Sequence, residues 1–402
     1  MAGMTFAPDD WMARPGFARL IKALGPGNAR IVGGAVRDTL LGIETADVDL
    51  ATTHDPHRVI ELLEAERIKA VPTGIEHGTI TAVSSDEVYE VTTLRRDVTT
   101  DGRRATVAFT DDWREDAARR DFTINALYAD PVTGELFDYF DGIADLEARR
   151  IRFIGDPYKR IAEDHLRILR FFRFLARFGD VPDLEGLAAC TDRANDLMAL
   201  SRERIANELL RLLVSPRAVA VVALMIDRGI FRPVLPEITG TTLFERVAAI
   251  EESAGLPPDP IRRLASLLPR SEAVGDDVGA RLKLSKLQRR RLTAALVPAR
   301  GSPFELAYRL GRETATDRWI MTIEESFDAV IGARHLQTLD IPEFPVSGGQ
   351  LVARGLTAGP DVARTRHLIE ERWIAEGFPD AARVSEIADE EVAQALDATR
   401  KA

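Results

Sequence analysis

Two aspartates, Asp47 and Asp49, are the residues of this chain whose type and spacing most directly suggest chemistry. They lie two positions apart in an extended run, and alternate side chains of a β-strand point to the same face. Two carboxylates on one face would suit Mg²⁺, which prefers oxygen ligands. An Asp-x-Asp pair is also typical of a solvated strand end, so the pair alone does not establish a metal site.

A glycine pair, Gly33-Gly34, precedes the aspartates and lies between a β-branched pair and a short predicted helix over residues 35–41. Because glycine has no Cβ, the backbone can turn sharply here and approach a ligand closely. Arg37 lies near the start of that helix, where its guanidinium and the free backbone N–H groups could bind one anion. This predicts a phosphate site, although a glycine pair after a strand is usually only a turn.

A third carboxylate, Glu90, lies in a β-type run over residues 88–93, one of several short runs that predict a small mixed sheet. If this strand runs beside the strand of Asp47 and Asp49, Glu90 could complete a two-metal site. It could equally be an ordinary outward-facing strand residue. The sequence alone leaves both interpretations open.

Several motifs together carry a resemblance to a known family. The pattern Gly-Gly-x-Val-Arg-Asp at 33–38, with Leu-Leu-Gly at 40–42 and Asp-x-Asp at 47–49, resembles a known nucleotidyltransferase signature. Class II CCA-adding enzymes (tRNA nucleotidyltransferases) and bacterial poly(A) polymerases share this signature. Residues 115–129 resemble the family's second motif, and residues 136–146 resemble its third, which we take as a hinge between two domains. The resemblance spans nearly all of the chain.

The resemblance implies roles for four further residues. It implies that Glu90 joins the two aspartates at the metal site. It assigns Arg120 to the triphosphate, and it assigns Asp121 and Asn125 to the neighbourhood of the ribose. From the sequence itself, Asp121 and Asn125 are four residues apart and would share one face of a helix.

An amphipathic helix with an arginine stripe is predicted over residues 160–178. Asp164 and Arg167 are adjacent on this helix, whereas Arg173 has drifted to the side opposite Asp164. A salt bridge between residues three apart, flanked by solvated arginines, would explain the pattern without any binding site.

The run Glu-Asp-x-x-Arg at 163–167 nevertheless resembles the family's nucleotide-selecting motif. In that motif the Asp acceptor and the Arg donor present a Watson–Crick-like edge that accepts C and A and refuses U and G. The resemblance therefore implies that Asp164 and Arg167 select CTP and ATP. Arg170 and Arg173 would support Asp164, the phosphates or the RNA end.

The composition is that of an ordinary globular protein, with 45% hydrophobic and 29% charged residues. The formal net charge is −11, so any contact with RNA phosphates must be local. The single cysteine, Cys190, excludes an internal disulfide and fits a reducing compartment. No apolar run is long enough to span a membrane. We expect a cytoplasmic protein.

The predicted fold class is α+β. Residues 1–148 would form a nucleotidyltransferase head with the small mixed sheet, residues 149–240 a helical neck, and residues 241–402 a helical body and tail. Within the head, the polar residues 96–112 predict a long mobile loop. In CCA-adding enzymes a loop at this position is implicated in the switch from adding C to adding A, and enzymes that add only CC have it shortened.

The resemblance implies an enzyme that adds C, C and A to the tRNA 3′ end from CTP and ATP, with Mg²⁺ as cofactor and release of pyrophosphate. A poly(A) polymerase or a CC-only enzyme is the alternative within the family. The loop over 96–112 and the lack of the Arg-rich segment of poly(A) polymerases argue against these. An inactive tRNA-binding relative is the non-enzymatic alternative. No membrane and no partner protein are implied.

Overall fold

The computed structural model describes residues 6, 10–45, 47–101, 104–324 and 326–401. It divides into two compact units, which are described separately. The N-terminal unit comprises residues 1–245, 258–269 and 273–290, and the C-terminal unit comprises residues 246–257, 270–272 and 291–402. The described residues include no helix that is long and apolar enough to cross a membrane.

A seven-stranded mixed sheet lies at the centre of the described part of the head, in the order β3-β4-β5-β2-β1-β8-β9. β2 and β5 are parallel, and the other neighbouring pairs are antiparallel. The fold class α+β is therefore confirmed. The strands are β1 (Ala29–Val32), β2 (Asp49–Thr52), β3 (Lys69–Gly74), β4 (Thr79–Ser84), β5 (Glu87–Thr93), β8 (Leu127–Ala129) and β9 (Leu136–Asp138).

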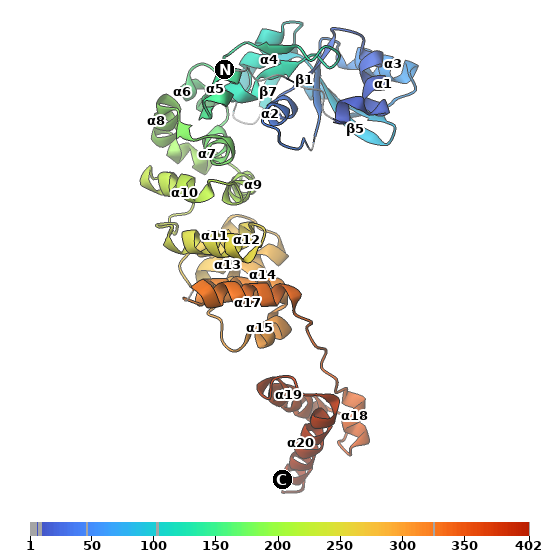
Figure 1. Ribbon diagram of the computed structural model, residues 1–402, viewed down its shortest axis with the longest axis vertical. Helices are drawn as coiled ribbons and strands as arrows, with labels where there is room; N and C mark the ends of the chain where they lie inside the picture. The colour runs from blue at the N-terminus through green and yellow to red at the C-terminus, as the bar shows by residue number, and fades with distance from the viewer. Residues whose placement is uncertain (1–5, 7–9, 46, 102–103, 325, 402) are drawn as a thin grey trace. The chain divides into compact units, whose positions relative to one another are not determined.

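Alternate side chains of β4 are buried, because helices cover one face of the sheet there. Along β4, Ile80 and Ala82 are fully buried, whereas Thr79 and Thr81 are only half-buried. α1 (Pro15–Leu24) and α3 (Pro56–Ala65) both contact β4, and Figure 1 shows both helices close to β5. On the other half of the sheet, α2 (Gly34–Leu40) contacts β1 and β8.

The pairing of β2 with β5 brings two predicted metal ligands side by side. Asp49 is the first residue of β2, and it pairs in register with Glu90 of β5. The two strands are therefore neighbours, as the metal-site hypothesis required. Asp47 lies two residues before the strand begins.

The prediction of a long loop over residues 96–112 was wrong. β6 (Arg95–Asp101) and β7 (Arg104–Phe109) pair as an antiparallel hairpin. Valine and threonine recur in both strands, and such β-branched residues favour extended backbone. α4 (Trp113–Ala118) follows the hairpin, and it begins at Asp112, whose carboxylate accepts a hydrogen bond from the Arg114 N–H at 2.8 Å.

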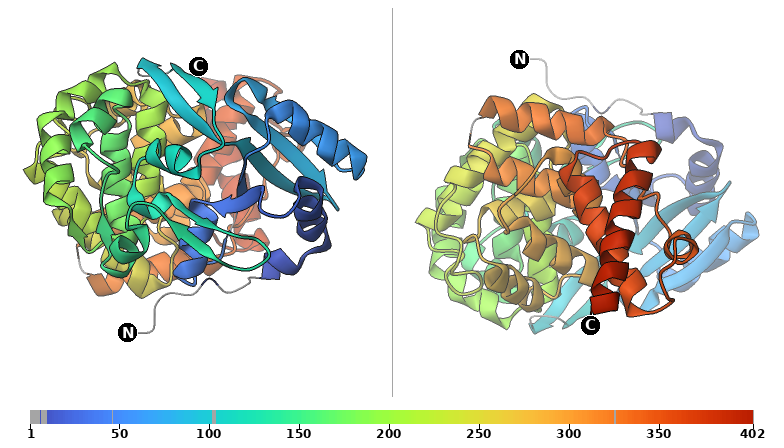
Figure 2. Two further views of the ribbon diagram at one scale, coloured as in Figure 1. Left: turned by 90° about the horizontal axis from the view of Figure 1, so that it is seen from above. Right: turned by 90° about the horizontal axis from the view of Figure 1, so that it is seen from below.

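The long helix predicted over residues 160–178 is broken in two. α6 (Pro157–Glu163) ends at Asp164, whose backbone is extended (φ −152°, ψ 107°), and α7 (Arg167–Phe178) begins three residues later. In the left view of Figure 2 the strands of the head (blue to teal) lie to one side, and the green helices that follow lie to the other. These helices include α8 (Leu184–Asp192), α9 (Arg202–Leu213) and α10 (Ala218–Asp227).

Aromatic rings join α7 to the strand segments of the head. The ring of Phe122 lies 4.9 Å from that of Phe153 and 5.2 Å from that of Phe174, measured between centroids. The rings of Phe153 and Phe171 stack at 5.5 Å. These contacts fix one face of α7, so its opposite face is free to present polar side chains.

The predicted hinge over residues 136–146 contains a buried ionic cluster. Asp145, on α5 (Gly142–Glu147), is completely buried. Its carboxylate accepts hydrogen bonds from the Thr123 hydroxyl at 2.7 Å, from Arg150 Nε at 2.6 Å and from Arg152 Nε at 2.8 Å. Three donors satisfy a carboxylate that would otherwise be costly to bury.

The rest of the chain is helical. α11 (Thr242–Ala254), α12 (Pro260–Ser266), α13 (Glu272–Arg281) and α14 (Lys286–Ala295) come first, and most of α11 and the end of α14 belong to the C-terminal unit. Further helices of the C-terminal unit follow. Those helices are α15 (Pro303–Leu310), α16 (Arg312–Thr322), α17 (Ser326–Thr338), α18 (Gly348–Ala353), α19 (Pro360–Ala375) and α20 (Ala381–Lys401). The predicted boundaries of head, neck and body at residues 148 and 240 stay predictions.

Candidate active site

One cavity of about 460 Å³ collects polar side chains from the head and from the helices that follow it. Ten of the thirteen predicted site residues line it. They are Gly33, Gly34, Arg37, Asp49, Arg120, Asp121, Asn125, Asp164, Arg167 and Arg170. Leu166, Phe174 and Arg204 also line the cavity, and the sequence did not single them out.

The glycine turn forms one wall of the cavity and requires glycine at its first position. Gly33 has φ 69° and ψ −117°, a conformation that residues with a Cβ rarely adopt. A Cβ at Gly33 would also lie 3.3 Å from Arg120 Nη1. Gly33 precedes α2, and its carbonyl accepts a hydrogen bond from the Arg37 N–H at 3.0 Å. The turn therefore brings the backbone close to two arginines.

Arg37 is buried beside this turn. Its Nε donates to Asp38 Oδ1 at 2.8 Å, and its Nη1 donates to Asn125 Oδ1 at 2.5 Å. The ring of Phe178 lies 4.2 Å from the guanidinium carbon. Burial lowers the pKa of Arg37, and the charge of Asp38 offsets only part of this effect. The guanidinium is thus held in one orientation at the wall of the cavity.

Arg120 is held by two buried groups. Its Nη2 donates to Asp116 Oδ2 at 3.2 Å, and its Nε donates to the Tyr128 hydroxyl oxygen at 3.3 Å. Tyr128 in turn donates its proton to Asp116 Oδ2 at 2.7 Å. Burial opposes the charge of Asp116, but Arg120 and Arg119 together hold the pKa of that carboxyl below its ordinary value. Asp116 therefore remains an anion that orients Arg120.

Asp121 and Asn125 meet in the cavity wall, but not on a helix as predicted. Asp121 lies outside any helix, and Asn125 ends η3 (Thr123–Asn125). Asn125 Nδ2 donates to Asp121 Oδ1 at 3.0 Å, and Arg170 Nε donates to Asp121 Oδ2 at 2.7 Å. Burial opposes the charge of Asp121, but Arg170 and Asn125 hold its pKa below the ordinary value.

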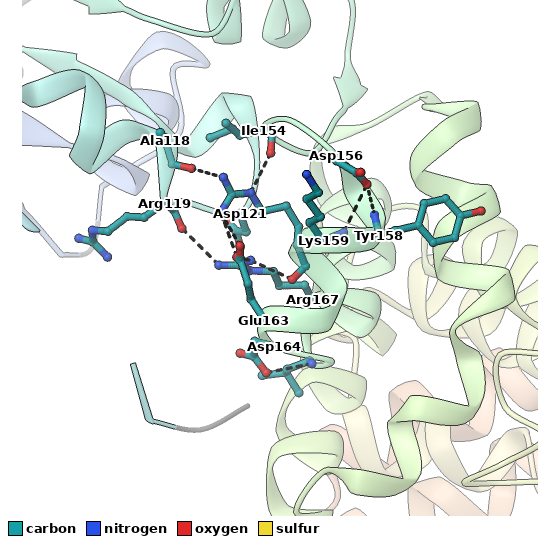
Figure 3. A network of polar contacts seen from close by, with 12 residues as sticks. Ala118, Arg119, Asp121, Ile154, Asp156, Tyr158, Lys159, Glu163, Asp164 and Arg167 are labelled. Carbon is teal, nitrogen blue, oxygen red and sulfur yellow. Dashed lines mark hydrogen bonds and ion pairs between the residues drawn. The ribbon is translucent and has the colours of Figure 1, made fainter. Parts of the chain in front are cut away.

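Asp164 and Arg167 are neighbours, since the Arg167 backbone N–H donates to the Asp164 carbonyl at 3.0 Å, but their side chains bond other partners because the helix breaks at Asp164. Arg167 Nη1 instead donates to Glu163 and to the Arg160 carbonyl at 2.9 Å, while its Nη2 donates to the Arg119 carbonyl at 3.2 Å. Asp164 Oδ2 accepts a hydrogen bond from Arg204 Nη2 at 2.7 Å. Both Asp164 and Arg167 still line the cavity, and Figure 3 shows Arg167 beside Glu163.

Two arginines bond the backbone at the C-terminal end of α4, which is followed two residues later by Arg120. Arg160 Nη2 donates to the Ala118 carbonyl at 2.6 Å, and Arg160 Nε donates to the Ile154 carbonyl at 2.8 Å. Arg167 bonds the next carbonyl, that of Arg119. Figure 3 shows these carbonyl groups around the end of α6. Cations at a helix C-terminus also interact favourably with the helix dipole.

Arg173 lies outside the cavity, which corrects its predicted place in the site. Its Nε donates to Glu208 Oε2 at 2.5 Å, and both side chains are buried. The helix phase explains this, since successive steps of three residues carry Arg173 around α7 and away from Asp164. Arg173 therefore joins α7 to α9, and Glu208 was not identified from the sequence.

The three predicted metal ligands, Asp47, Asp49 and Glu90, are not assembled into a preformed metal site. Asp49 lines the cavity and is exposed at the start of β2. Loss of part of its hydration raises the pKa of Asp49, and repulsion from Glu90 and Asp47 raises it further, while Arg120 opposes the shift. Among the described residues, no three acidic, histidine or cysteine side chains are grouped closely enough to hold a metal ion. Asp47 and Glu90 do not line the cavity.

Two family models match separate stretches of the chain. Residues 29–152 match the family described as the poly(A) polymerase head domain. Residues 183–240 match the family described as a probable RNA and SrmB-binding site of polymerase A. The first match contains the glycine turn, the three predicted metal ligands and Arg120.

Individual relatives cover most of the chain. It is 38% identical over 369 residues to the mitochondrial CCA tRNA nucleotidyltransferase 1 of Mus musculus, covering 87% of this chain and 83% of the relative. The enzyme of the same name from Homo sapiens is 37% identical with the same coverage. The CCA-adding enzyme of Bacillus stearothermophilus, solved in complex with CTP, superimposes with a TM-score of 0.74 at 27% identity, covering 96% of this chain and 98% of that one. This chain therefore belongs to the family of CCA tRNA nucleotidyltransferases.

Proposed function

We propose that the chain adds C, C and A in turn to the 3′ end of tRNA, using CTP and ATP and releasing pyrophosphate. One observation carries the proposal. The phosphate-binding and base-selecting residues predicted from separate motifs line a single cavity, although they come from different elements of the head and neck. That cavity is therefore suited to hold a nucleoside triphosphate with its phosphates and its base recognised at once.

The proposed reaction exchanges one phosphoanhydride bond for one phosphodiester bond. The 3′ oxygen of the RNA attacks the α-phosphorus of the nucleotide and forms a new P–O bond. The bond between the α-phosphorus and the oxygen bridging to the β-phosphate breaks, and pyrophosphate leaves. The hydroxyl proton passes to solvent. Positioning of the triphosphate and neutralisation of its charge supply most of the catalysis in such transfers.

Arg37 and Arg120 are the proposed phosphate ligands. Both are fixed by carboxylates and both flank the Gly33 turn, so a triphosphate can reach two guanidiniums and nearby backbone N–H groups together. Arg170 lines the same cavity and is held by Asp121. Contact of the ribose with Asp121 and Asn125 stays a prediction, since both side chains already hold arginines.

Asp164 and Arg167 are the proposed base-selecting pair. Asp164 would accept a hydrogen bond from the exocyclic amino group of C or A, and Arg167 would donate to the adjacent ring nitrogen. Uracil and guanine present a carbonyl to Asp164, where two acceptors face each other and no hydrogen bond forms. The open N–H groups of Arg167 remain available, because its known partners occupy only part of the guanidinium.

Asp47 and Asp49 are the proposed ligands of Mg²⁺, with Glu90 as a third. The chemistry of the donors fits, because carboxylate oxygens suit a hard divalent cation and Asp49 pairs in register with Glu90 on the neighbouring strand. Bound Mg²⁺ would lower the pKa of the RNA 3′-hydroxyl and neutralise the triphosphate.

Cytoplasmic location is also a proposal, based on the single cysteine and the absence of long apolar runs from the sequence.

The proposal is tested with tRNA transcripts that lack CCA. The purified protein is incubated with Mg²⁺ and with CTP, ATP or both, and the products are separated at single-nucleotide length. We expect growth by three nucleotides only when both nucleotides are present. Asp49→Asn should extend no transcript, because it removes a proposed metal ligand. A sample treated with EDTA should extend none either, because EDTA removes the Mg²⁺ ion.

Other products would contradict the proposal in distinct ways. Arrest after two nucleotides with both substrates present would identify a CC-adding enzyme. A long ladder from ATP alone would identify a poly(A) polymerase. Tight binding of tRNA without any extension would identify an inactive relative. Normal extension by Asp49→Asn would overturn the metal assignment while leaving the reaction itself intact.

A further inference from the structure

Arg204 is a cavity residue to which none of the sequence motifs assigns a role. It lies in the first turn of α9, and its side chain reaches the same cavity as Asp164. Its Nη2 donates to Asp164 Oδ2 at 2.7 Å, and the two side chains are 30% and 28% exposed. Among the described residues Arg204 forms no other salt bridge. The interaction links two residues that are forty positions apart.

The carboxylate of Asp164 is fixed from two directions. Its Oδ1 accepts a hydrogen bond from the Leu166 N–H at 3.1 Å, which comes from the short break between α6 and α7. Among the residues that the structure describes, Arg204 is the one side chain that bonds Asp164 Oδ2. Each carboxylate oxygen can accept two hydrogen bonds, so both oxygens keep acceptor capacity. Without Arg204, rotation of the carboxylate would be limited by the Leu166 contact alone.

The position of Arg204 is itself set by packing. α9 contacts α7 along its length, and Ile205 and Leu209 are buried against the neighbouring helices. The buried pair of Arg173 with Glu208 joins the same two helices one turn further along. The guanidinium of Arg204 therefore extends from a well-packed helix. Because this helix is fixed, the guanidinium can hold the Asp164 carboxylate in one position.

We propose that Arg204 is a positioning residue that determines base selectivity by orienting the Asp164 carboxylate. This inference rests on the proposed function of Asp164. Selection of C and A depends on an acceptor at a fixed place, because a displaced acceptor loses the amino group of the correct base and makes room for a wrong one. Arg204 acts through Asp164 and not by transferring phosphate, so its loss should change the choice of base more than the rate of bond formation.

The test measures kcat/KM for CTP and for UTP on tRNA lacking CCA, using wild type, Arg204→Gln and Arg204→Lys. We expect Arg204→Gln to lower the preference for CTP over UTP by about tenfold to 100-fold, the usual effect of losing one hydrogen bond between charged groups. The value of kcat with CTP at saturation should change much less. Arg204→Lys keeps the cation and should restore part of the preference.

Two controls separate positioning from general damage. Arg211→Gln removes an exposed arginine from the same helix, away from the cavity lining, and should keep the wild-type preference. In the background of Asp164→Asn, the substitution Arg204→Gln should have no further effect on the preference, since the group it positions is gone. Thermal melting of each variant shows whether the fold is kept.

Three results would overturn the inference. They are an unchanged preference in Arg204→Gln, an equal loss in Arg211→Gln, or an effect of Arg204→Gln that is undiminished in the Asp164→Asn background. The last result would mean that Arg204 contacts the nucleotide directly. Failure of the proposed function would be distinct, because the wild-type protein would then extend no transcript with CTP or ATP.

Discussion

Each arginine that lines the cavity is paired with a carboxylate. The pairs are Arg37–Asp38, Arg120–Asp116, Arg167–Glu163, Arg170–Asp121 and Arg204–Asp164. A guanidinium has five N–H donors, so one carboxylate partner leaves others for a ligand. Because the side chains are already ordered, a nucleotide need not restrict their rotamers on binding. The pairs therefore order the guanidiniums of the proposed nucleotide cavity and limit the electrostatic repulsion among its five cations.

The pair of Arg120 with Asp116 gives a prediction for nucleotide binding. Asp116→Asn removes the anion that orients Arg120, so the KM for CTP and the KM for ATP should both rise about tenfold. The preference for CTP over UTP should not change, because the base-selecting pair is untouched. Tyr128→Phe removes a hydroxyl that bonds both Asp116 and Arg120 but keeps the Asp116 anion, and should raise both KM values less. Steady-state kinetics on matched tRNA substrates measure both effects, and an unchanged KM in Asp116→Asn would contradict them.

The pair of Arg170 with Asp121 gives a prediction for stability against pH. Asp121→Asn should destabilise the protein by about 3 kcal/mol, since it leaves a largely buried guanidinium unpaired. The pKa of Asp121 is lower in the folded chain than in the unfolded chain. Its ionised carboxylate therefore adds fully to the free energy of unfolding above the unfolded pKa of about 3.9, and this stabilisation is lost as the pH falls below that value. The free energy of unfolding of Asp121→Asn should therefore lie below that of the wild type by the same amount at pH 7 and at pH 5.5.

Urea denaturation at both pH values measures this difference. The midpoints of wild type and Asp121→Asn should differ by the same amount at pH 7 and pH 5.5, and by less at pH 3.5. A difference that already shrinks between pH 7 and pH 5.5 would mean that the carboxyl is protonated in that range, against the lowered pKa. Asp156→Asn, which alters an exposed helix cap, serves as a control for general effects of removing an aspartate.

For individual residues, the sequence predicted most of those that line the cavity but few of the contacts that they make. The motif resemblance identified ten lining residues, because family motifs mark residue types at fixed positions. It did not identify Arg204, since the bond to Asp164 joins two helices and leaves no periodic signal in either. The sequence also did not show that the side chains of Asp164 and Arg167 bond other partners, because a change of backbone conformation at Asp164 interrupts the helix.

Among the elements, α4 and α6 are joined more closely than the sequence indicates. Arg160 on α6 reaches the carbonyl groups of Ala118 and Ile154, and it also pairs with Glu163 at 2.9 Å. Glu163 in turn holds Arg167. The end of α4 leads directly to Arg120. The element proposed to select the base and the segment proposed to bind phosphate are therefore connected by hydrogen bonds from arginine side chains to main-chain carbonyl groups.

This connection predicts that Arg160→Gln impairs the site without touching the nucleotide. Loss of two bonds to carbonyl groups should destabilise the protein by about 1–3 kcal/mol, and kcat/KM should fall for CTP and ATP alike because Arg120 and Arg167 lose a common support. Lys159→Gln is the matched control, since Lys159 is the exposed neighbour on the same helix. Chemical denaturation and steady-state kinetics measure the two effects. If Arg160→Gln and Lys159→Gln had the same stability and the same kcat/KM, the proposed link between α4 and α6 through Arg160 would be contradicted.

Strands and helices were predicted well where the local pattern was strong. The runs at β4 and β5 alternate in burial and are separated by Ser84, Ser85 and Asp86, so their positions could be predicted from the sequence. The hairpin of β6 and β7 was taken for a loop because its polar composition hid the β-branched residues. The break between α6 and α7 contains neither proline nor glycine, so the amphipathic pattern continued across it without a stop signal.

Across the whole molecule, the net charge of −11 contrasts with the cavity, which has five arginines and three aspartates in its lining. The expectation that RNA contacts must be local follows from this contrast. Outside the cavity, α14 carries two exposed cations one helical turn apart, Lys286 and Arg290. Among the described residues neither forms a salt bridge. Cations that no carboxylate neutralises are available for phosphates.

This arrangement predicts that Lys286 and Arg290 bind the tRNA backbone away from the reacting end. The double variant Lys286→Gln/Arg290→Gln should raise the KM for tRNA severalfold and leave the KM for CTP unchanged. If each cation meets one phosphate, the slope of log K against log salt should weaken by about 0.7–0.9 per residue removed. Arg58→Gln/Lys69→Gln, which removes two exposed cations from the head, should change neither quantity. Titrations of tRNA at several KCl concentrations distinguish the cases, and a slope equal to that of wild type would exclude this surface from tRNA binding.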